Sequence, residues 1–344
     1  MSMIHHLKIA KLLVYNYTPK DQAMASPNKP VALIIGASRG IGRQIAIDLA
    51  KNNYTVIIAA KSTSTTTTNP EQFPPDPNSP ASTITTVAQE INLLTPNTAY
   101  PIPVDVRFPA QIDDLVAQTL RITGGRLDVV VYNSGAIWWS SVRNTPVKRF
   151  RLMQQVNPEG LYATVQAVLP VFERIGNRGR IVVVSPPVYS RFFRGKTGYA
   201  IGKVGMSVLT RGLAMDFVRE GKTEMAITSI WPAAAVQSAA TEMNPAGNDE
   251  SRSKADLRKP TIFSDAILGI LKAPPHIVNG MLALDEDFLR DHCGVTDFSK
   301  YSVVPGTNPR RMMPKKLPVL EVEEQDDEGM RMDSAKSRST ASKL

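Results

Sequence analysis

The chain has 344 residues, 42% of them hydrophobic, and a formal net charge of +9. This length allows one large domain or two small ones, with an ample core in either case. The positive charge suits an anionic ligand such as a phosphate or a CoA moiety, although general solubility is the simpler explanation. No basic run alternates with aromatic residues, which argues against nucleic acid as a partner. No stretch approaches the roughly twenty apolar residues that a transmembrane segment needs. The single cysteine, Cys293, excludes an internal disulfide and fits a reducing compartment.

Residues 1–29 are expected to form an N-terminal extension on which no function depends. Lys8 and Lys11 interrupt its apolar residues too often for a secretory signal, and it lacks the arginines of a typical transit peptide. Met24 is a more conventional start, so we interpret the extension either as peripheral to the fold or as an artefact of the assigned start.

Residues 31–42 read VALIIGASRGIG and combine a short apolar run with three glycines. A run that is apolar on both faces predicts a buried parallel strand, and the amphipathic residues 43–51 predict a helix. Gly36, Gly40 and Gly42 would let the backbone approach a pyrophosphate, whose charge then lies at the helix N-terminus. Glycines also serve plain tight turns, but their position between a strand and a helix favours dinucleotide binding.

Alternating strands and helices follow this glycine turn. Strands are predicted over residues 54–60, 99–106, 127–132, 181–184, 226–231 and 277–284, and helices over residues 84–94, 109–122, 146–173, 198–217 and 261–271. The alternation predicts an α/β fold with a doubly wound parallel sheet (a Rossmann fold), in a single domain over residues 30–306. The ligand of such a sheet is expected across the carboxyl ends of the strands.

Four stretches depart from the regular alternation. Residues 62–82 are rich in Thr, Pro and Ser and are predicted to be a surface loop. Pro158, inside the predicted helix 146–173, should kink the backbone and leave a polar residue beside carbonyls that water can reach. Residues 239–260 are polar and aperiodic, as a substrate lid would be. Residues 307–344 are predicted to be a disordered tail because of their proline and charge content.

The end of the second predicted strand bears on the choice of cofactor. An acidic residue there would bind the adenosine ribose hydroxyls of NAD. This chain has Ala60 and Lys61 instead, and Arg39 stands in the glycine turn. Two cations without a carboxylate favour a 2′-phosphate and hence NADP. The alternative is that Lys61 is an ordinary solvated lysine at a strand end.

Tyr199 and Lys203 are four residues apart on a predicted helix, so they share one face. A free tyrosine has a pKa near 10, which makes it a poor proton donor or acceptor at neutral pH. A neighbouring ammonium group and an oxidised nicotinamide would favour the phenolate and bring the pKa toward the working range. Lys203 could also hold the nicotinamide ribose, and Ser185, at another strand end, is the nearest hydroxyl that could orient a carbonyl. The alternative is an exposed tyrosine with an incidental lysine.

These motifs together resemble the short-chain dehydrogenase/reductase family over about residues 30–285. The resemblance rests on Gly36/Gly40/Gly42, Asp105-Val106, Asn133-Ser134-Gly135-Ala136, Asn157 and Tyr199/Lys203. Within the family, the chain is similar to the hydroxysteroid-dehydrogenase-like subgroup in residues 59–61, 104–107, 185–187, 231–232 and 298–306.

The resemblance implies that Tyr199 is the catalytic acid/base, that Lys203 is its partner, that Asn157 belongs to a water relay, and that NADP is the cofactor. The residues expected to bind the cofactor are Gly36, Ser38, Arg39, Gly40, Ile41, Gly42, Lys61, Asp105, Val106, Asn133, Gly135, Lys203, Pro232 and Val236. No metal site is predicted.

Three positions depart from the family pattern. Ile35 replaces the threonine that usually precedes the first glycine, and Tyr132 replaces the first asparagine of the motif N-N-A-G. The family's catalytic serine usually lies thirteen residues before the tyrosine, where this chain has Pro186. Ser185 is the first candidate to substitute for it and Ser190 the second. A cofactor-binding protein with little or no catalysis is therefore kept as an alternative.

The last three residues, Ser342-Lys343-Leu344, form the S-K-L peroxisomal signal at the end of a flexible tail. The sequence therefore predicts a peroxisomal NADP-dependent oxidoreductase that acts on a carbonyl or alcohol of a lipid or acyl-CoA. Its expected partners are this small-molecule substrate and the import receptor, and a homo-oligomer formed through the two long helices is expected from the family. The alternatives are an enoyl-type reductase and a cofactor-binding scaffold.

Overall fold

A computed structural model describes residues 28–65, 78–96, 98–242 and 254–323 of the chain. The chain divides into two compact units, residues 1–313 and residues 314–344. All of the helices and strands named below belong to the first unit. In the second unit, the described residues 314–323 contain no helix or strand.

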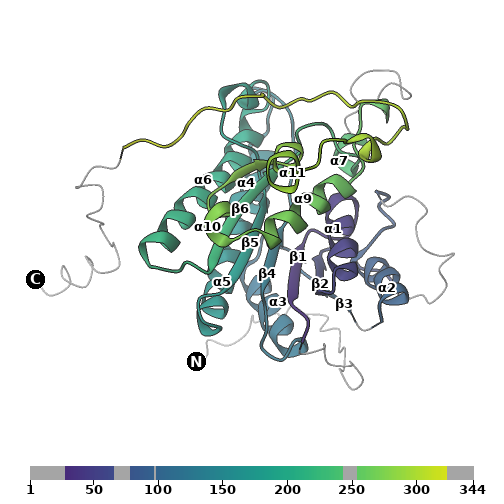
Figure 1. Cartoon of the computed structure of the whole chain (residues 1–344), viewed down its shortest axis with the longest axis vertical. Helices are drawn as coiled ribbons and strands as arrows, with labels where there is room; N and C mark the ends of the chain where they lie inside the picture. Colours follow the sequence, from purple (N-terminus) through teal and green to yellow (C-terminus); the bar gives the residue numbers. More distant parts are fainter. Residues whose placement is uncertain (1–27, 66–77, 97, 243–253, 324–344) are drawn as a thin grey trace, which may run out of the picture. The chain divides into compact units, whose positions relative to one another are not determined.

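The centre of the first unit is a sheet of seven parallel strands in the order β3-β2-β1-β4-β5-β6-β7 (Figure 1). The strands are β1 Val31–Ile35, β2 Thr55–Ala60, β3 Ala99–Pro103, β4 Val129–Tyr132, β5 Gly179–Val184, β6 Met225–Trp231 and β7 Leu282–Leu284. Ile35 pairs with both Ala59 and Tyr132, so β1, β2 and β4 end at one edge of the sheet. The strand order reverses between β1 and β4, which is where a doubly wound sheet binds its ligand. The predicted fold class is confirmed.

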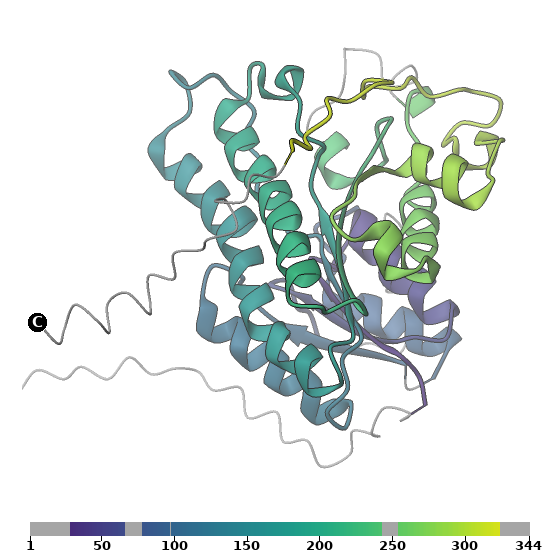
Figure 2. The same cartoon turned by 60° about the vertical axis from the view of Figure 1, so that its left-hand side comes forward.

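Helices cover both faces of the sheet (Figures 1 and 2). The first face is covered by α1 Gly40–Lys51, α2 Ile84–Leu94, α9 Thr261–Lys272 and α11 Asp285–Cys293. The second face is covered by α3 Pro109–Ile122, α5 Gly160–Arg174 and α6 Thr197–Arg219. The remaining elements are α4 Val147–Gln154, α7 Ala239–Glu242, α10 Pro275–Val278, the π-helix η2 Gln155–Glu159, and the 3₁₀ turns η3 Ser190–Phe193 and η4 Ser299–Tyr301.

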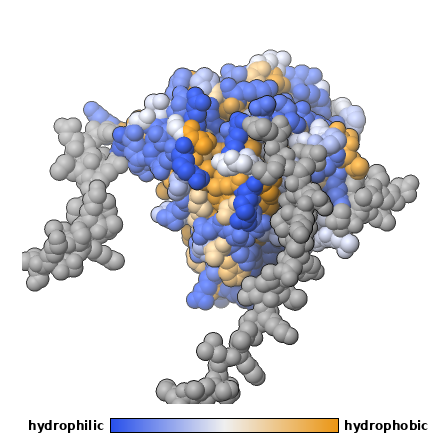
Figure 3. Space-filling view, turned by 90° about the horizontal axis from the view of Figure 1, so that it is seen from below, coloured by the Kyte–Doolittle hydropathy of each residue, from blue (hydrophilic) through white to orange (hydrophobic). Residues whose placement is uncertain are grey.

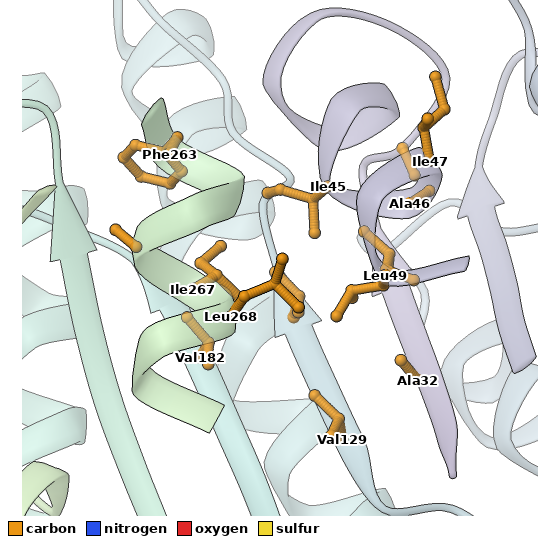
Figure 4. Close-up of a cluster of buried hydrophobic side chains, with 14 of the residues drawn as sticks. Ala32, Ile45, Ala46, Ile47, Leu49, Val129, Val182, Phe263, Ile267 and Leu268 are labelled. Atoms are coloured by element: carbon orange, nitrogen blue, oxygen red, sulfur yellow. The ribbon is translucent and has the colours of Figure 1, made fainter. Parts of the chain in front are cut away.

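The two hydrophobic cores follow from the alternation of side chains along each strand. In β1, Ala32 and Ile34 belong to the first core, whereas Val31, Leu33 and Ile35 belong to the second. A strand that is buried on both faces must be apolar throughout, and this is what the uninterrupted run predicts. In Figure 4, side chains of α1 and α9, including Ile45, Leu49, Ile267 and Leu268, meet over the sheet. Burial of each large apolar side chain of this kind contributes roughly 1.5–3 kcal/mol to the stability of the folded state.

Two predicted strands differ from those in the structure. The predicted strand 277–284 is wrong over its first half, because Pro275 begins the short helix α10 and only Leu282–Leu284 pairs with β6. The predicted strand 99–106 ends at Pro103. Beyond it, the Asp105 backbone N–H donates to the side chain of Gln111, which draws the chain away from the sheet.

The predicted helix 146–173 is broken by a π-helix at the position where the proline kink is expected. Pro158 has no N–H to donate, and the N–H of Gly160 instead bonds to the carbonyl of Gln155, five residues back. Tyr132 supports this irregular turn, because its hydroxyl donates to the carbonyl of Val156 at 2.6 Å. The tyrosine that replaces the family's asparagine therefore has a hydrogen-bond partner in this turn.

Parts of the predicted lid and of the predicted tail are ordered. Within 239–260, residues 239–242 form α7, residues 243–253 lie outside the described part, and Arg258 is buried at 4% exposure. Its Nε donates to Glu286 at 2.9 Å. The N–H groups of Met312 and Met313 donate to the carbonyl of Ala233. The lid prediction is therefore wrong for residues 254–260, and the disorder prediction is wrong for residues 307–313. In both cases the partners are too far away in sequence to be recognised.

The surface contains apolar as well as polar areas. Seen from below, apolar residues gather in the middle of the face between hydrophilic areas (Figure 3). Among the described residues, large exposed apolar side chains on α6 are Ile201, Val208, Met215 and Val218. No helix in the described ranges combines the length and the hydropathy required to cross a membrane.

Candidate active site

The glycine turn between β1 and α1 is held closed by backbone contacts. Gly36 has φ = +91°, a conformation that favours glycine, and its N–H donates to the carbonyl of Ala59 at 2.7 Å. A Cβ at Gly42 would overlap the carbonyl of Gly36, so only glycine allows the helix to approach the strand this closely. Asn133 donates to the same carbonyl at 2.8 Å. The first turn of α1 therefore starts at the carboxyl edge of the sheet, beside the loop that follows β4.

Several residues beside the glycine turn were not predicted. Ser82, at the end of the 62–82 insert, donates to the carbonyl of Ser38 at 2.7 Å. A Cβ at Gly40 would lie 3.2 Å from Oδ1 of Asn78 and 3.7 Å from Cβ of Ser238. The insert and the loop after β6 thus both reach the turn. Residues 66–77 of the insert lie outside the described part of the chain.

A carboxylate that follows the neighbouring strand lies beside the end of β2, and the sequence pattern does not reveal this contact. Asp105, which follows β3, lies 3.4 Å from Nζ of Lys61 and forms a close ion pair with Arg107. The hydrogen bond from Arg107 is the largest cause that lowers the pKa of Asp105 to about 2. The choice of NADP was predicted from two cations without a carboxylate nearby, and this premise is wrong. The side chain of Lys61 is nonetheless 63% exposed, and an ion pair with so exposed a partner is weak.

Tyr199, Lys203, Asn157 and Gly135 lie together where α6, the π-helix and the loop after β4 meet. Lys203 Nζ donates to the carbonyl of Val184, at the end of β5, at 2.9 Å. A Cβ at Gly135 would lie 3.3 Å from this Nζ and 3.6 Å from Oδ1 of Asn157. The predicted residues from three separate segments thus share one place at the carboxyl ends of the strands.

Asn157 holds the loop after β4. Its Oδ1 accepts from the N–H of Ala136 at 2.8 Å, and its Nδ2 donates to the carbonyl of the same residue at 3.1 Å. The side chain has no exposed surface. The position of Ala136, and with it that of Gly135, therefore depends on the π-helix that carries Asn157.

Burial shifts both members of the tyrosine–lysine pair toward their neutral forms. Tyr199 is 2% exposed, and burial raises the pKa of its phenol. Lys203 is 4% exposed, and burial lowers the pKa of its ammonium group to about 7. Lys203 and an oxidised nicotinamide were together expected to lower the pKa of Tyr199; in the protein alone, desolvation raises this pKa.

The hydroxyl of Ser185 is buried and takes part in a hydrogen bond. Ser185 has no exposed surface, and Ser207 Oγ donates to Ser185 Oγ at 3.0 Å and lies 2.6 Å from the carbonyl of Pro186. Ser190 is exposed at the start of η3. Because Ser185 accepts in this contact, its own O–H is not used by Ser207, and its role in orienting a carbonyl stays a prediction.

Aromatic side chains that were not predicted surround Tyr199. The rings of Trp139 and Phe192 each lie 6.2 Å from the ring of Tyr199, and Phe192 also lies 5.8 Å from Trp231. Lys203 Nζ lies 5.7 Å from the Trp231 ring centre. No periodic pattern marks these residues in the sequence, because they stand in three different loops and strand ends.

The loop after β6 is anchored from below by α11. The N–H of Ala233 donates to Oδ1 of Asp285 at 2.8 Å. Val236, one of the predicted cofactor contacts, is buried and pairs with Arg258, whereas Pro232 is half-buried at the start of the loop. The described residues also form an open pocket of about 280 Å³ lined by Asp48, Asp265 and Tyr301 among others, and none of the predicted site residues lines it.

Comparison with known proteins agrees with this geometry. Residues 30–249 match the family model of the short chain dehydrogenases. Hydroxysteroid dehydrogenase-like protein 2 from Mus musculus is 35% identical over 275 residues, which are 79% of this chain and 51% of the relative. The protein of the same name from Danio rerio is 36% identical over 275 residues, 79% of this chain and 60% of the relative.

A solved short chain dehydrogenase from Mycobacterium thermoresistibile is also similar, with a TM-score of 0.68 and 31% identity over 83% of this chain and 95% of that chain. The resemblance to the hydroxysteroid-dehydrogenase-like subgroup is thus confirmed. The chain spans only about half the length of the mouse relative.

Proposed function

Because the chain belongs to the short chain dehydrogenase family, we propose that it is an NADP-dependent oxidoreductase that transfers a hydride between the nicotinamide and a carbonyl or alcohol. The observation that carries the proposal is the meeting of Tyr199, Lys203 and Asn157 at the strand ends, beside a glycine turn. The cofactor, when bound, supplies or accepts the hydride. The chain itself has to bind the substrate and move a proton.

The glycine turn fits a dinucleotide. Gly42 lets α1 begin against the carbonyl of Gly36, and the first N–H groups of this helix are the proposed donors for a pyrophosphate. Gly135, which has an exposed surface, and Lys203 would face the nicotinamide ribose. Ser38, Ile41, Val106, Pro232 and Val236 remain proposed contacts.

Tyr199 would give a proton to the carbonyl oxygen of the substrate. Since burial raises the pKa of its phenol, Tyr199 is neutral at physiological pH, which is the form that can donate. The pKa of Lys203 is about 7, so its Nζ can take up and release a proton near physiological pH. Lys203 would thus return a proton to Tyr199 after each reduction, with water near Asn157 as the proposed source.

The proposed acid/base pair is tested by two variants. Tyr199→Phe keeps the ring but removes the exchangeable proton, so turnover of a panel of carbonyl compounds with NADPH should fall by about 10²- to 10⁴-fold. NADPH affinity, measured by fluorescence titration, should change little. Lys203→Ala should reduce both turnover and NADPH affinity. Full activity of Tyr199→Phe would refute the assignment, and tight NADPH binding without turnover of any compound would favour the scaffold.

The preference for NADP is proposed from Arg39 and Lys61, with Arg107 nearby, against the single carboxylate of Asp105. Lys61→Asp would place two carboxylates at the end of β2. We expect this change to weaken NADPH binding by about 1.5–3 kcal/mol, the usual contribution of a charge-assisted hydrogen bond, and to level or reverse the preference over NADH. The measurement is the ratio of the two dissociation constants.

Lys51→Asp makes the same change of charge at the far end of α1 and should leave that ratio unchanged. Equal affinity of the unmodified protein for NADPH and NADH would contradict the proposed role of Lys61.

The proposed substrate is a lipid or acyl-CoA, and the proposed compartment is the peroxisome because of Ser342-Lys343-Leu344, which lies outside the described residues. A homo-oligomer is proposed as well, since α6 exposes Ile201, Val208 and Met215 along its length. An enoyl-type reductase would use the same fold and cofactor, and is the second candidate.

A further inference from the structure

Two segments beside Tyr199 carry many cations and no carboxylate. Residues 136–151, after β4, and residues 189–198, before and into α6, contain no Asp or Glu. The cations within them are Arg143, Lys148, Arg149, Arg151, Arg191, Arg194 and Lys196. Among the described residues, no carboxylate forms an ion pair with any of these seven. We call these two segments the basic rim.

The two segments of the basic rim are in contact. A Cβ at Gly198 would lie 3.5 Å from both Thr145 and Phe150, and Gln154, just beyond the first segment, donates to the carbonyl of Gly198 at 3.2 Å. The side chain of Lys196 also crosses from one segment to the other, since its Nζ lies 5.4 Å from the centre of the Trp139 ring. The two segments that carry the seven cations therefore adjoin each other.

Lys196 is the member of the basic rim that contacts the aromatic rings around Tyr199. Its Nζ is 4.2 Å from the centre of the Phe192 ring. Phe192 and Trp139 are the same two rings that pack against Tyr199 at 6.2 Å each. Six cations of the rim are exposed, whereas Lys196 is half-buried, and burial lowers the pKa of its ammonium group. A partly desolvated ammonium group without a carboxylate partner binds anions more strongly than an exposed one does.

We propose that Lys196 and the basic rim form a subsite for an anionic group that the substrate carries away from its reacting carbon, with the exposed ring of Trp139 packed against the apolar part of the same molecule. The anion is a carboxylate or a phosphate, and both would accept hydrogen bonds from Lys196 Nζ. This inference rests on the proposed function, because it names the class of substrate that would reach Tyr199.

The subsite is tested by binding, which does not require turnover. Isothermal titration calorimetry with the full chain would measure the affinity for decanoate, decanoyl-CoA and decanol, which share an alkyl chain of similar length. At least one of the two anions should bind on the order of tenfold more tightly than decanol. Lys196→Gln should remove this advantage, and Lys196→Arg, which keeps the charge, should retain most of it.

Two controls separate the source of the anion from a general effect of charge. If the natural anion is a phosphate, the double variant Arg191→Gln/Arg194→Gln should weaken the binding of decanoyl-CoA more than that of decanoate. If it is a single carboxylate, the double variant should weaken the binding of both ligands equally and only slightly. Lys51→Gln, at the exposed end of α1, should change neither.

Equal affinity for the anions and decanol, or anion binding that survives Lys196→Gln, would overturn the subsite. Failure of the proposed function would look different, because NADPH binding in a separate titration, or turnover of the panel of carbonyl compounds, would then be absent whatever the affinities for the anions.

Discussion

Asp285 illustrates at the residue scale how burial changes the chemistry of an ordinary side chain. It is 1% exposed, its Oδ1 accepts from Ala233 and Glu286, and its Oδ2 has no hydrogen-bond partner among the described residues. Desolvation raises the pKa of this carboxyl to about 7, although Arg258 opposes the shift. A buried charge without full compensation costs stability.

The sign of this effect gives a prediction. Because the pKa of Asp285 is higher in the folded state, its cost is absent near pH 4, grows as the pH rises, and is complete above about pH 7. Asp285→Asn keeps the acceptor for both N–H groups and cannot ionise. The difference in free energy of unfolding between variant and wild type should therefore increase in favour of the variant from pH 4 to pH 8, by a few kcal/mol at about 1.4 kcal/mol for each unit of pKa.

Urea denaturation at several pH values measures this difference. Lys203 acts in a separate window, because its lowered pKa of about 7 makes wild-type stability rise between pH 7 and about 10. A difference between Asp285→Asn and wild type that stays constant from pH 4 to pH 8 would show that Asp285 is ionised throughout.

At the element scale, the first turn of α11 joins three segments that are distant in sequence. Asp285 holds the loop after β6 through Ala233, and Glu286 holds Arg258. Asp287 accepts two hydrogen bonds from Arg311, at 2.6 and 2.7 Å. Acidic residues are favourable at a helix N-terminus in any case, so the turn serves both its own helix and the segments around the loop after β6.

The contact between Asp287 and Arg311 should stabilise the packing of residues 307–313. Both side chains are partly exposed, at 31% and 19%, so the coupling free energy should be about 1 kcal/mol, above that of a fully exposed pair. A double-mutant cycle with Asp287→Asn and Arg311→Gln, measured by urea denaturation, would give this energy.

Arg290 supplies the matched control, since it bonds to the same carboxylate at 3.0 Å but is 45% exposed. The cycle with Arg290→Gln should give a smaller coupling. A coupling near zero for Arg311 would mean that the hydrogen bonds of Met312 and Met313 to Ala233 hold this segment without help.

At the scale of the whole molecule, location is proposed from the last three residues alone. If an import receptor reads Ser342-Lys343-Leu344, a fluorescent fusion at the N-terminus should be punctate and coincide with a peroxisomal marker. Deletion of Leu344 should leave the fusion diffuse in the cytosol. Because none of the residues proposed to bind NADPH lies among the last residues of the chain, the protein should keep its NADPH affinity after this deletion. Punctate import without Leu344 would refute the signal and draw attention to residues 1–29.

The sequence by itself determined the doubly wound sheet, the glycine turn, and the Tyr199/Lys203 pair on one helix. These features rest on local physics: an apolar run that must be buried on both faces, glycines that must admit backbone, and a four-residue spacing that must share a helix face. Even the kink at Pro158 is local, because proline cannot donate wherever it stands.

The tertiary structure alone decided which partners those residues meet. It brought Asp105 to Lys61, Ser207 to Ser185, Glu286 to Arg258, and the rings of Trp139 and Phe192 to Tyr199. No spacing in the sequence encodes these contacts, since each joins residues of different segments of the chain. The pKa values of Tyr199 and Lys203 depend on burial for the same reason: desolvation is set by everything that packs around a group, and most of those neighbours come from elsewhere in the chain.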